Sequence, residues 1–337
     1  MAKLLLIDGN SLTYRAFFAL PTDMATSSGQ VTNAVFGFCR MLVHLLKDQR
    51  PDYIAVAFDR PEPTFRHKEV ADYKANRAEA PDILRQQIGL VRQVVQALKI
   101  PVVELPGWEA DDCIATLATR ARDRGDEVVI VTGDRDAFQL VGDPLVKVLY
   151  NKRGVTDYVL YDEAGIIEKT GVHPSRYAEY AALRGDPSDN LPGVPGVGEK
   201  TAARLINEFG SIDGIYANLD KLTPKLRDAL REHEAQVRAN AKVTPLVRDL
   251  PLDVDIEELR MGGWDEEEVR RLFAFLEFRT MYRDLVEAVG RDVAANAPAT
   301  TGTLEAETSV AGTAAEAVAA LRSGEGPIAL AAAWGGG

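Results

Sequence analysis

Short hydrophobic runs alternate with amphipathic segments in the first half of the chain. Five of these runs are rich in β-branched residues, which favours buried strands, and they cover residues 4–7, 53–58, 102–105, 128–132 and 146–150. Between them, apolar residues recur at helical spacing in the segments at about 33–48, 82–98 and 109–124. The alternation predicts an α/β fold with a mostly parallel central sheet covered by helices. Ligand sites of such sheets gather at the carboxyl ends of the strands.

The pattern changes after about residue 173. Helical segments broken by Gly and Pro continue to about 290, which predicts an α/β core over 1–173 and an all-helical subdomain over 174–290. A loop is expected between a helix that ends near Leu183 and one that begins near Glu199. The Ala-, Thr- and Gly-rich stretch 291–337 predicts a linker and the start of a truncated further domain, as in a fragment of a longer protein.

Composition narrows the class of protein. No run of about 18 uncharged apolar residues occurs, and the N-terminus turns polar after seven residues, so we expect a soluble, cytoplasmic protein without a membrane partner. Cys39 and Cys113 have no metal-ligand spacing, which favours two buried hydrophobic residues over a disulfide or a zinc site.

The charge distribution bears on a nucleic-acid partner. A net charge of −12 argues against one, because phosphate contacts need Lys and Arg. However, residues 104–143 hold ten acids against four bases, whereas 60–77 holds five bases against three acids and 193–248 nine against seven. An acidic centre between basic surfaces suits an enzyme that binds metal ions and grips a polyanion. If that polyanion is DNA, we expect the protein to be nucleoid-associated within the cytoplasm.

Eight of nine candidate acids follow predicted strands or stand in loops beside helix starts. Each taken alone fits a helix cap equally well. Packed together, however, they would raise one another's pKa unless cations lay among them, and an oxygen-only set favours Mg²⁺ or Mn²⁺. Two such ions would support phosphodiester hydrolysis. The candidate ligands are Asp8, Asp59, Glu109, Asp111, Asp112, Asp134, Asp136, Asp186 and Asp189.

Two further segments are candidates for DNA contacts. If 66–77 is helical, its cations and Tyr73 share one face and could hold a phosphate and stack on a base, although a solvated charged helix is the plain alternative. The loop at 193–198 leads into a helix and could present backbone N–H groups to a DNA phosphate and carbonyls to a monovalent cation, or simply connect two helices. The candidates are Arg66, Tyr73, Lys74, Arg77, Gly193, Gly196, Gly198, Lys200 and Thr201, with Tyr14 and Arg15 after Asp8.

These motifs, read in order from residue 4 to 285, resemble the 5' nuclease (flap endonuclease) family, in particular the N-terminal 5'-3' exonuclease domains of bacterial DNA polymerase I. The segments DGNSLTYRAFFAL, GWEADDCIATLA, VTGDRDAFQLV and LRGDPSDNLPGVPGVGEKTAARLI carry the resemblance, together with 57–77. It implies that all nine acids bind Mg²⁺ or Mn²⁺, that Arg66 and Lys74 act in catalysis from a helical arch at about 60–100, and that Tyr14 stacks at the duplex end.

The resemblance also implies a helix-three-turn-helix at 190–209 that clamps duplex DNA and binds K⁺. The expected activity is 5'-3' exonuclease and flap endonuclease cleavage of DNA, and of RNA primers on DNA, during replication and repair. The expected partner is branched or nicked duplex DNA with a 5' end or flap. The protein is expected to be a monomer, with a polymerase domain linked to it in a longer protein.

Three other interpretations stay open. A single-strand RNase of the PIN type shares the acidic α/β core but has no clamp over 190–290. A non-catalytic DNA-binding module would bind flaps with or without divalent metal. The third is a free-standing flap endonuclease. The segment PIALAAAWGGG is similar to the first strand of a proofreading-exonuclease domain but has no acids at the metal-binding positions. A free-standing enzyme would lack that domain.

Overall fold

The computed structural model describes residues 1–296 and 313, and residues 1–295 form one compact unit. Its strands form one sheet in the order β3-β2-β1-β4-β5-β6, with every neighbouring pair parallel except β5 and β6. The predicted α/β class and mostly parallel sheet are confirmed. The strands are β1 (Lys3–Asp8), β2 (Tyr53–Ala57), β3 (Val102–Val103), β4 (Glu127–Thr132), β5 (Val146–Arg153) and β6 (Asp157–Tyr161).

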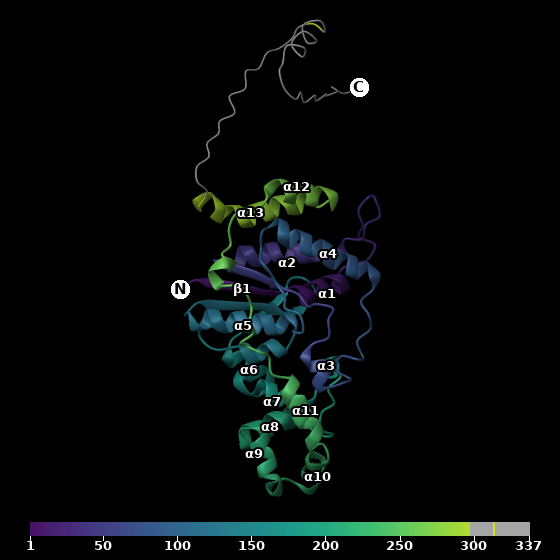
Figure 1. The fold of residues 1–337 in the computed structure, drawn as a ribbon, viewed down its shortest axis with the longest axis vertical. Helices are drawn as coiled ribbons and strands as arrows, with labels where there is room; N and C mark the ends of the chain where they lie inside the picture. The colour runs from purple at the N-terminus through teal and green to yellow at the C-terminus, as the bar shows by residue number, and fades with distance from the viewer. Residues whose placement is uncertain (297–312, 314–337) are drawn as a thin grey trace. The chain divides into compact units, whose positions relative to one another are not determined.

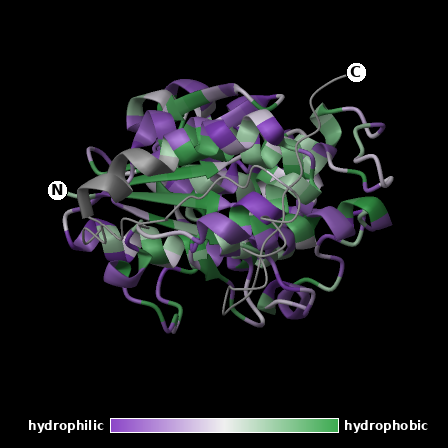
Figure 2. Cartoon of the chain, turned by 90° about the horizontal axis from the view of Figure 1, so that it is seen from above, coloured by the Kyte–Doolittle hydropathy of each residue, from purple (hydrophilic) through white to green (hydrophobic). Residues whose placement is uncertain are grey.

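Both faces of the sheet are buried. Along β1, Leu4 and Leu6 belong to one hydrophobic core and Leu5 and Ile7 to another, because successive side chains of a strand point to opposite faces. In Figure 2 the strands near the N-terminus carry the green of hydrophobic residues. The near-continuous hydrophobic runs in the sequence follow from this two-sided burial. Edge strand β6 was not predicted, because its side chains are only partly buried.

The three predicted helices in the first half are α2 (Asn33–Gln49), α4 (Asp82–Ala97) and α5 (Ala110–Asp123). The prediction missed α1 (Gly9–Ala19). The remaining helices are α3 (Phe65–Glu69), α6 (Glu163–Thr170), α7 (Tyr177–Arg184), α8 (Glu199–Phe209), α9 (Ile212–Ala217), α10 (Pro224–Glu232), α11 (Glu234–Val243), α12 (Glu266–Phe275) and α13 (Arg279–Asn296), with short 3₁₀ turns η1 (Asp136–Leu140), η2 (Pro174–Arg176), η3 (Pro187–Asp189), η4 (Leu219–Lys221) and η5 (Ile256–Leu259).

Helices α2 and α4 cover one face of the sheet and α5 covers the other (Figure 1). Helices α7 to α11 extend from the α5 side, whereas α12 and α13 return to the α2 and α4 side. The helices of the range 174–290 therefore lie on both sides of the sheet, and the bounds 174–290 of a helical subdomain stay a prediction. None of the described helices is both long and apolar enough to span a bilayer.

The basic segment 60–77 differs from its prediction. Only α3 is helical there, and residues 71–76 form turns, with Lys74 in the left-handed region at φ 56°. The condition that 66–77 is helical, on which a shared face of its side chains depended, is therefore not met. Cys39 and Cys113 are buried and unpaired, as predicted. The predicted linker and truncated domain lie outside the described residues, apart from their first few positions.

Candidate active site

A pocket of about 380 Å³ opens at the carboxyl ends of the strands, where the sequence placed its acids. Asp8 ends β1, Asp59 follows β2, Asp111 lies in the first turn of α5, and Asp134 follows β4. Because β1, β2 and β4 are parallel neighbours, their ends meet at the same edge of the sheet. The other lining residues are Asn10, Ser11, Tyr14, Arg15, Phe18, Lys74, Arg77, Ala110 and Gly133.

Local hydrogen bonds hold the acids in place. Asp8 caps α1 by accepting from the Ser11 backbone N–H at 2.9 Å, and its other oxygen accepts from Thr132 Oγ1 at 2.8 Å. Asp59 accepts from the backbone N–H of Ala110, the first residue of α5, at 2.8 Å. The helix-cap and ligand interpretations therefore do not exclude each other, since each carboxylate keeps lone pairs free toward the pocket.

The buried acids of the pocket are unfavourable in their charged form unless cations lie near them. Burial, with added repulsion from Asp59 and Asp134, raises the pKa of Asp8 to about 7. Burial also raises the pKa of Asp111 well above its usual value, and the charges of Asp8 and Asp134 add to it. Carboxylates that resist ionisation together would ionise readily beside a bound cation.

Further acidic side chains lie beside those that line the pocket. Burial raises the pKa of Asp136 well above its usual value, and the nearby charges of Asp134 and Asp189 raise it further. Burial, then the charges of Asp189 and Asp186, raise the pKa of Asp134 in the same way. The structure thus places Asp136, Asp186 and Asp189 next to the pocket without lining it.

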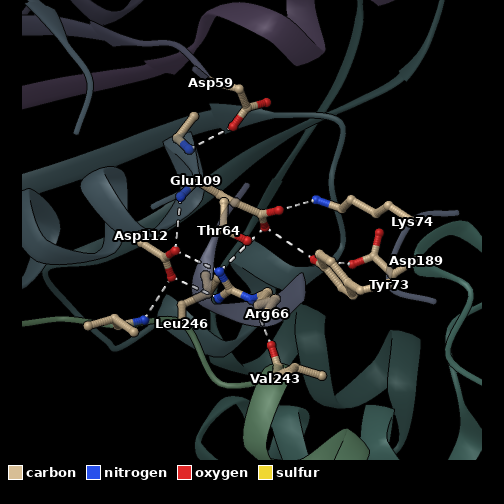
Figure 3. A network of polar contacts seen from close by, with 12 residues as sticks. Asp59, Thr64, Arg66, Tyr73, Lys74, Glu109, Asp112, Asp189, Val243 and Leu246 are labelled. Carbon is tan, nitrogen blue, oxygen red and sulfur yellow. Dashed lines mark hydrogen bonds and ion pairs between the residues drawn. The ribbon is translucent and has the colours of Figure 1, made fainter. Parts of the chain in front are cut away.

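Cations from the basic segment reach into this acidic region. Lys74 Nζ lies 2.7 Å from Oε1 of Glu109, and Arg77 Nη2 lies 2.7 Å from Oδ1 of Asp189 (Figure 3 shows the first of these contacts). Burial opposes the charged form of Glu109, but the charges of Lys74 and Arg66 hold its pKa below the usual value. Lys74 and Arg77 both line the pocket, so they stand where a phosphate would meet the acids.

Arg66 and Asp112 are buried and paired with each other. Arg66 is 1% exposed and Asp112 is 0% exposed, and they form a two-pronged ion pair at 2.6 and 2.8 Å (Figure 3). The remaining Arg66 donors bind the carbonyls of Val243 and Pro245. In this structure the two side chains are buried and paired with each other, and the catalytic role expected of Arg66 and the ligand role expected of Asp112 stay predictions.

Tyr73, predicted to stack on a base, is buried as well. It is 4% exposed, and its hydroxyl donates to Asp189 at 2.8 Å, so its ring cannot stack on a base in this structure. The aromatic surface at the pocket is instead Tyr14 with Phe18, which is 73% exposed and which the sequence reading missed. The signal was present in the helical spacing of these two residues after Asp8. Arg15 lines the pocket as well, and its Nη2 donates to the carbonyl of Asn151 at 3.3 Å.

The glycines of the loop at 193–198 differ in how closely other atoms approach them. A Cβ on Gly193 would stand 1.9 Å from the carbonyl oxygen of Arg184, so this glycine serves close backbone packing. Gly196, with φ 81°, and Gly198 have open space around them. Gly198 precedes α8 without a side-chain cap, and Lys200 is exposed while Thr201 is half-buried in the first turn. Free N–H groups and a cation therefore lie together at this helix start.

The donor chemistry of the pocket fits a hard divalent cation. The acids supply only oxygen ligands, the type that Mg²⁺ and Mn²⁺ prefer. Among the described residues, no three His, Cys, Asp or Glu side chains stand close enough to enclose an ion as they are placed. Like-charged carboxylates repel one another, and here Lys74 and Arg77 supply the compensating positive charge.

Two family profiles match consecutive parts of the chain. The profile of a family described as "5'-3' exonuclease, N-terminal resolvase-like domain" matches residues 3–171. A second profile, "5'-3' exonuclease, C-terminal SAM fold", matches residues 172–267.

Curated relatives carry the name DNA polymerase I. The protein of Mycobacterium tuberculosis (strain ATCC 25618 / H37Rv) is 50% identical over 279 residues, covering 82% of this chain and 31% of that protein. The protein of Bacillus subtilis (strain 168) is 39% identical over 293 residues, covering 87% of this chain and 33% of that protein. The chain thus spans about a third of the length of the relatives it matches.

Solved structures share the fold. A flap endonuclease of bacteriophage T5, in a complex with DNA and metal ions, has a TM-score of 0.60 at 20% identity, covering 86% of this chain and 99% of that one. The catalytic core of Rad2 with a DNA substrate has a TM-score of 0.52 at 18% identity, covering 86% and 92%. At these identities the likeness concerns the fold alone.

Proposed function

This chain belongs to the 5'-3' exonuclease family, and on that premise we propose that it hydrolyses phosphodiester bonds near free 5' ends of branched or nicked DNA, using divalent metal ions. The proposal includes 5' flaps and RNA primers on DNA, as replication and repair require. The observation that carries it is the pocket in which carboxylates from β1, β2, α5 and β4 meet two cations of the basic segment. The family match over 172–267 covers the region that a PIN-type RNase lacks.

We assign metal binding first to Asp8, Asp59, Asp111 and Asp134, which line the pocket, and then to Asp136, Asp186 and Asp189 beside it. Two Mg²⁺ or Mn²⁺ ions bound there would lower the pKa of the attacking water and stabilise the departing oxygen. Structures of phage T5 nucleases with metal ions support a divalent cofactor. Glu109 would be free to join only after Lys74 leaves it.

The chain's own cations and aromatic rings would position the substrate. Lys74 and Arg77 line the pocket and can transfer their ion pairs from carboxylates to the scissile phosphate. Tyr14 and Phe18 present rings at the same pocket, where the terminal base pair could stack. Tyr73 would instead hold Asp189 in place.

The turn before α8 is proposed as the duplex clamp. The N–H groups at Gly196 and Gly198 with Lys200 and Thr201 suit a backbone phosphate, and the turn carbonyls suit K⁺. Under this proposal the DNA-binding part of the predicted 174–290 subdomain is the portion from α7 to α11.

The test is cleavage of a 5'-labelled flap and a blunt duplex with Mg²⁺, with Mn²⁺ and with a chelator. Asp134→Asn should lower the rate about 100-fold or more, because it removes a ligand from the pocket. Asp48→Asn, on α2 away from the pocket and 54% exposed, is the control and should cut normally. Cutting by Asp134→Asn at the wild-type rate, or flap binding without any cutting by the wild type, would refute the proposal.

A separate measurement addresses whether the chain is part of a longer protein. We propose that the chain is the front of a DNA polymerase I, since the named relatives are about three times as long. A free-standing flap endonuclease is the alternative. The two are separated by the length of the native protein that an antibody against residues 1–295 detects in its source cells.

A further inference from the structure

Two arginines outside the pocket point to one carboxylate oxygen. Arg135 follows Asp134 directly, and its Nη1 lies 3.0 Å from Oε1 of Glu199. Arg184 ends α7, and its Nη1 lies 3.5 Å from the same oxygen. Glu199 is the first residue of α8. The three side chains therefore connect the acidic pocket to the start of the proposed clamp.

The side chain of Arg184 is held by several contacts within the protein, whereas that of Glu199 is exposed. The side chain of Arg184 is 11% exposed; its guanidinium lies over the Tyr180 ring at 5.3 Å, and its Nε donates to the carbonyl of Gly185 at 3.0 Å. Its Nη2 also lies 3.5 Å from Asp186 Oδ2. The side chain of Glu199 is 56% exposed. An exposed carboxylate is the member of such a cluster that another anion can replace at low cost.

Two buried polar groups near this cluster lack partners. Among the described residues, the hydroxyl of Tyr177 and the Nε of Arg135 have no hydrogen-bond partner, although Tyr177 is 0% exposed. The charges of Arg184, Glu199 and Arg135 all act on Tyr180. Buried polar groups are almost always hydrogen-bonded in folded proteins. Unused donors next to two guanidinium groups indicate a site for an anionic, oxygen-rich ligand.

We propose that Arg135 and Arg184 bind a backbone phosphate of the DNA, and that Glu199 occupies this position until the phosphate displaces it. The proposal rests on the proposed function and adds a contact between the cleavage pocket and the clamp. A phosphate offers oxygens to both guanidinium groups at once, as the single Glu199 oxygen does now. The contact reads no base and sets how the duplex lies relative to the pocket.

The test is binding of a labelled flap by the full chain in a chelator, so that the DNA stays intact, over a range of KCl concentrations. Arg135→Gln should weaken binding about tenfold and lower the slope of log affinity against log salt by about 0.9, the value for one lost phosphate contact. Glu199→Gln should tighten binding about two- to fivefold, because the phosphate no longer competes with a carboxylate.

A matched control lies on the same helix. Glu208 pairs with the exposed Arg204 at 3.0 Å near the other end of α8, so Glu208→Gln changes the net charge equally and should leave the affinity unchanged. Arg135→Lys should restore part of the affinity. The proposal is overturned if Arg135→Gln keeps the wild-type slope, or if Glu199→Gln binds no better than Glu208→Gln. Failure of the proposed nuclease function would instead appear as binding without cutting when Mg²⁺ is added to the wild type.

Discussion

Arg66 lies where the basic segment, the start of α5 and the end of α11 meet. It joins Asp112 by two hydrogen bonds and the carbonyls of Val243 and Pro245 by two more. Asp112 also accepts from the backbone N–H of Val247. One buried pair thus fixes three parts of the chain around the pocket, and its loss would leave the buried Arg66 with only the longer ion pair to Glu109, at 3.4 Å.

We therefore expect Asp112→Asn to lower the free energy of unfolding by about 3–5 kcal/mol, measured by urea titration. The control is Asp213→Asn, which breaks an exposed pair with Arg238 and should cost less than about 1 kcal/mol. Equal stability of the two variants would show that the buried pair has no structural role.

At the scale of elements, the connection from α7 to α8 depends on close backbone contact. Gly193 faces the carbonyl of Arg184, and the Val194 N–H donates to the Leu183 carbonyl at 3.1 Å. These contacts hold the loop against the end of α7. The helix start that follows is kept near the pocket by the same packing.

Gly193→Ala should lower the free energy of unfolding by about 1–3 kcal/mol and weaken flap binding, because the added Cβ displaces the loop. Gly198→Ala meets open space and should cost less than about 1 kcal/mol. Urea titration of both variants measures the difference. A Gly193→Ala protein as stable as the wild type would mean that the loop is not held by this contact.

At the scale of the whole molecule, the sheet separates two cores with different tasks. The core on the α5 side continues into α7 to α11, next to the pocket and the proposed clamp. The core on the α2 and α4 side includes α12 and α13. None of the residues that line the pocket lies on α12 or α13, so damage to this part of the second core should reduce stability without changing the chemistry.

Phe273 on α12 is 1% exposed in that second core, so Phe273→Ala should cost about 3–5 kcal/mol in unfolding free energy. Cleavage per folded molecule should stay at the wild-type rate, because Phe273 is remote from the pocket lining. Phe275→Ala, on the same helix at 54% exposed, should change stability by less than about 0.5 kcal/mol. A large loss of activity in folded Phe273→Ala protein would contradict this separation.

The sequence by itself determined the sheet, its main helices and the edge at which Asp8, Asp59, Asp111 and Asp134 meet. Strand runs and helix caps are local patterns, and parallel pairing then places strand ends together. It could not determine which charged side chain pairs with which, since ion pairs such as Arg66 with Asp112 join positions far apart in the chain. The tertiary structure alone decided that Tyr73 is buried, that Phe18 is exposed, and that Arg135 and Arg184 share Glu199, because burial and charge pairing depend on every neighbouring segment at once.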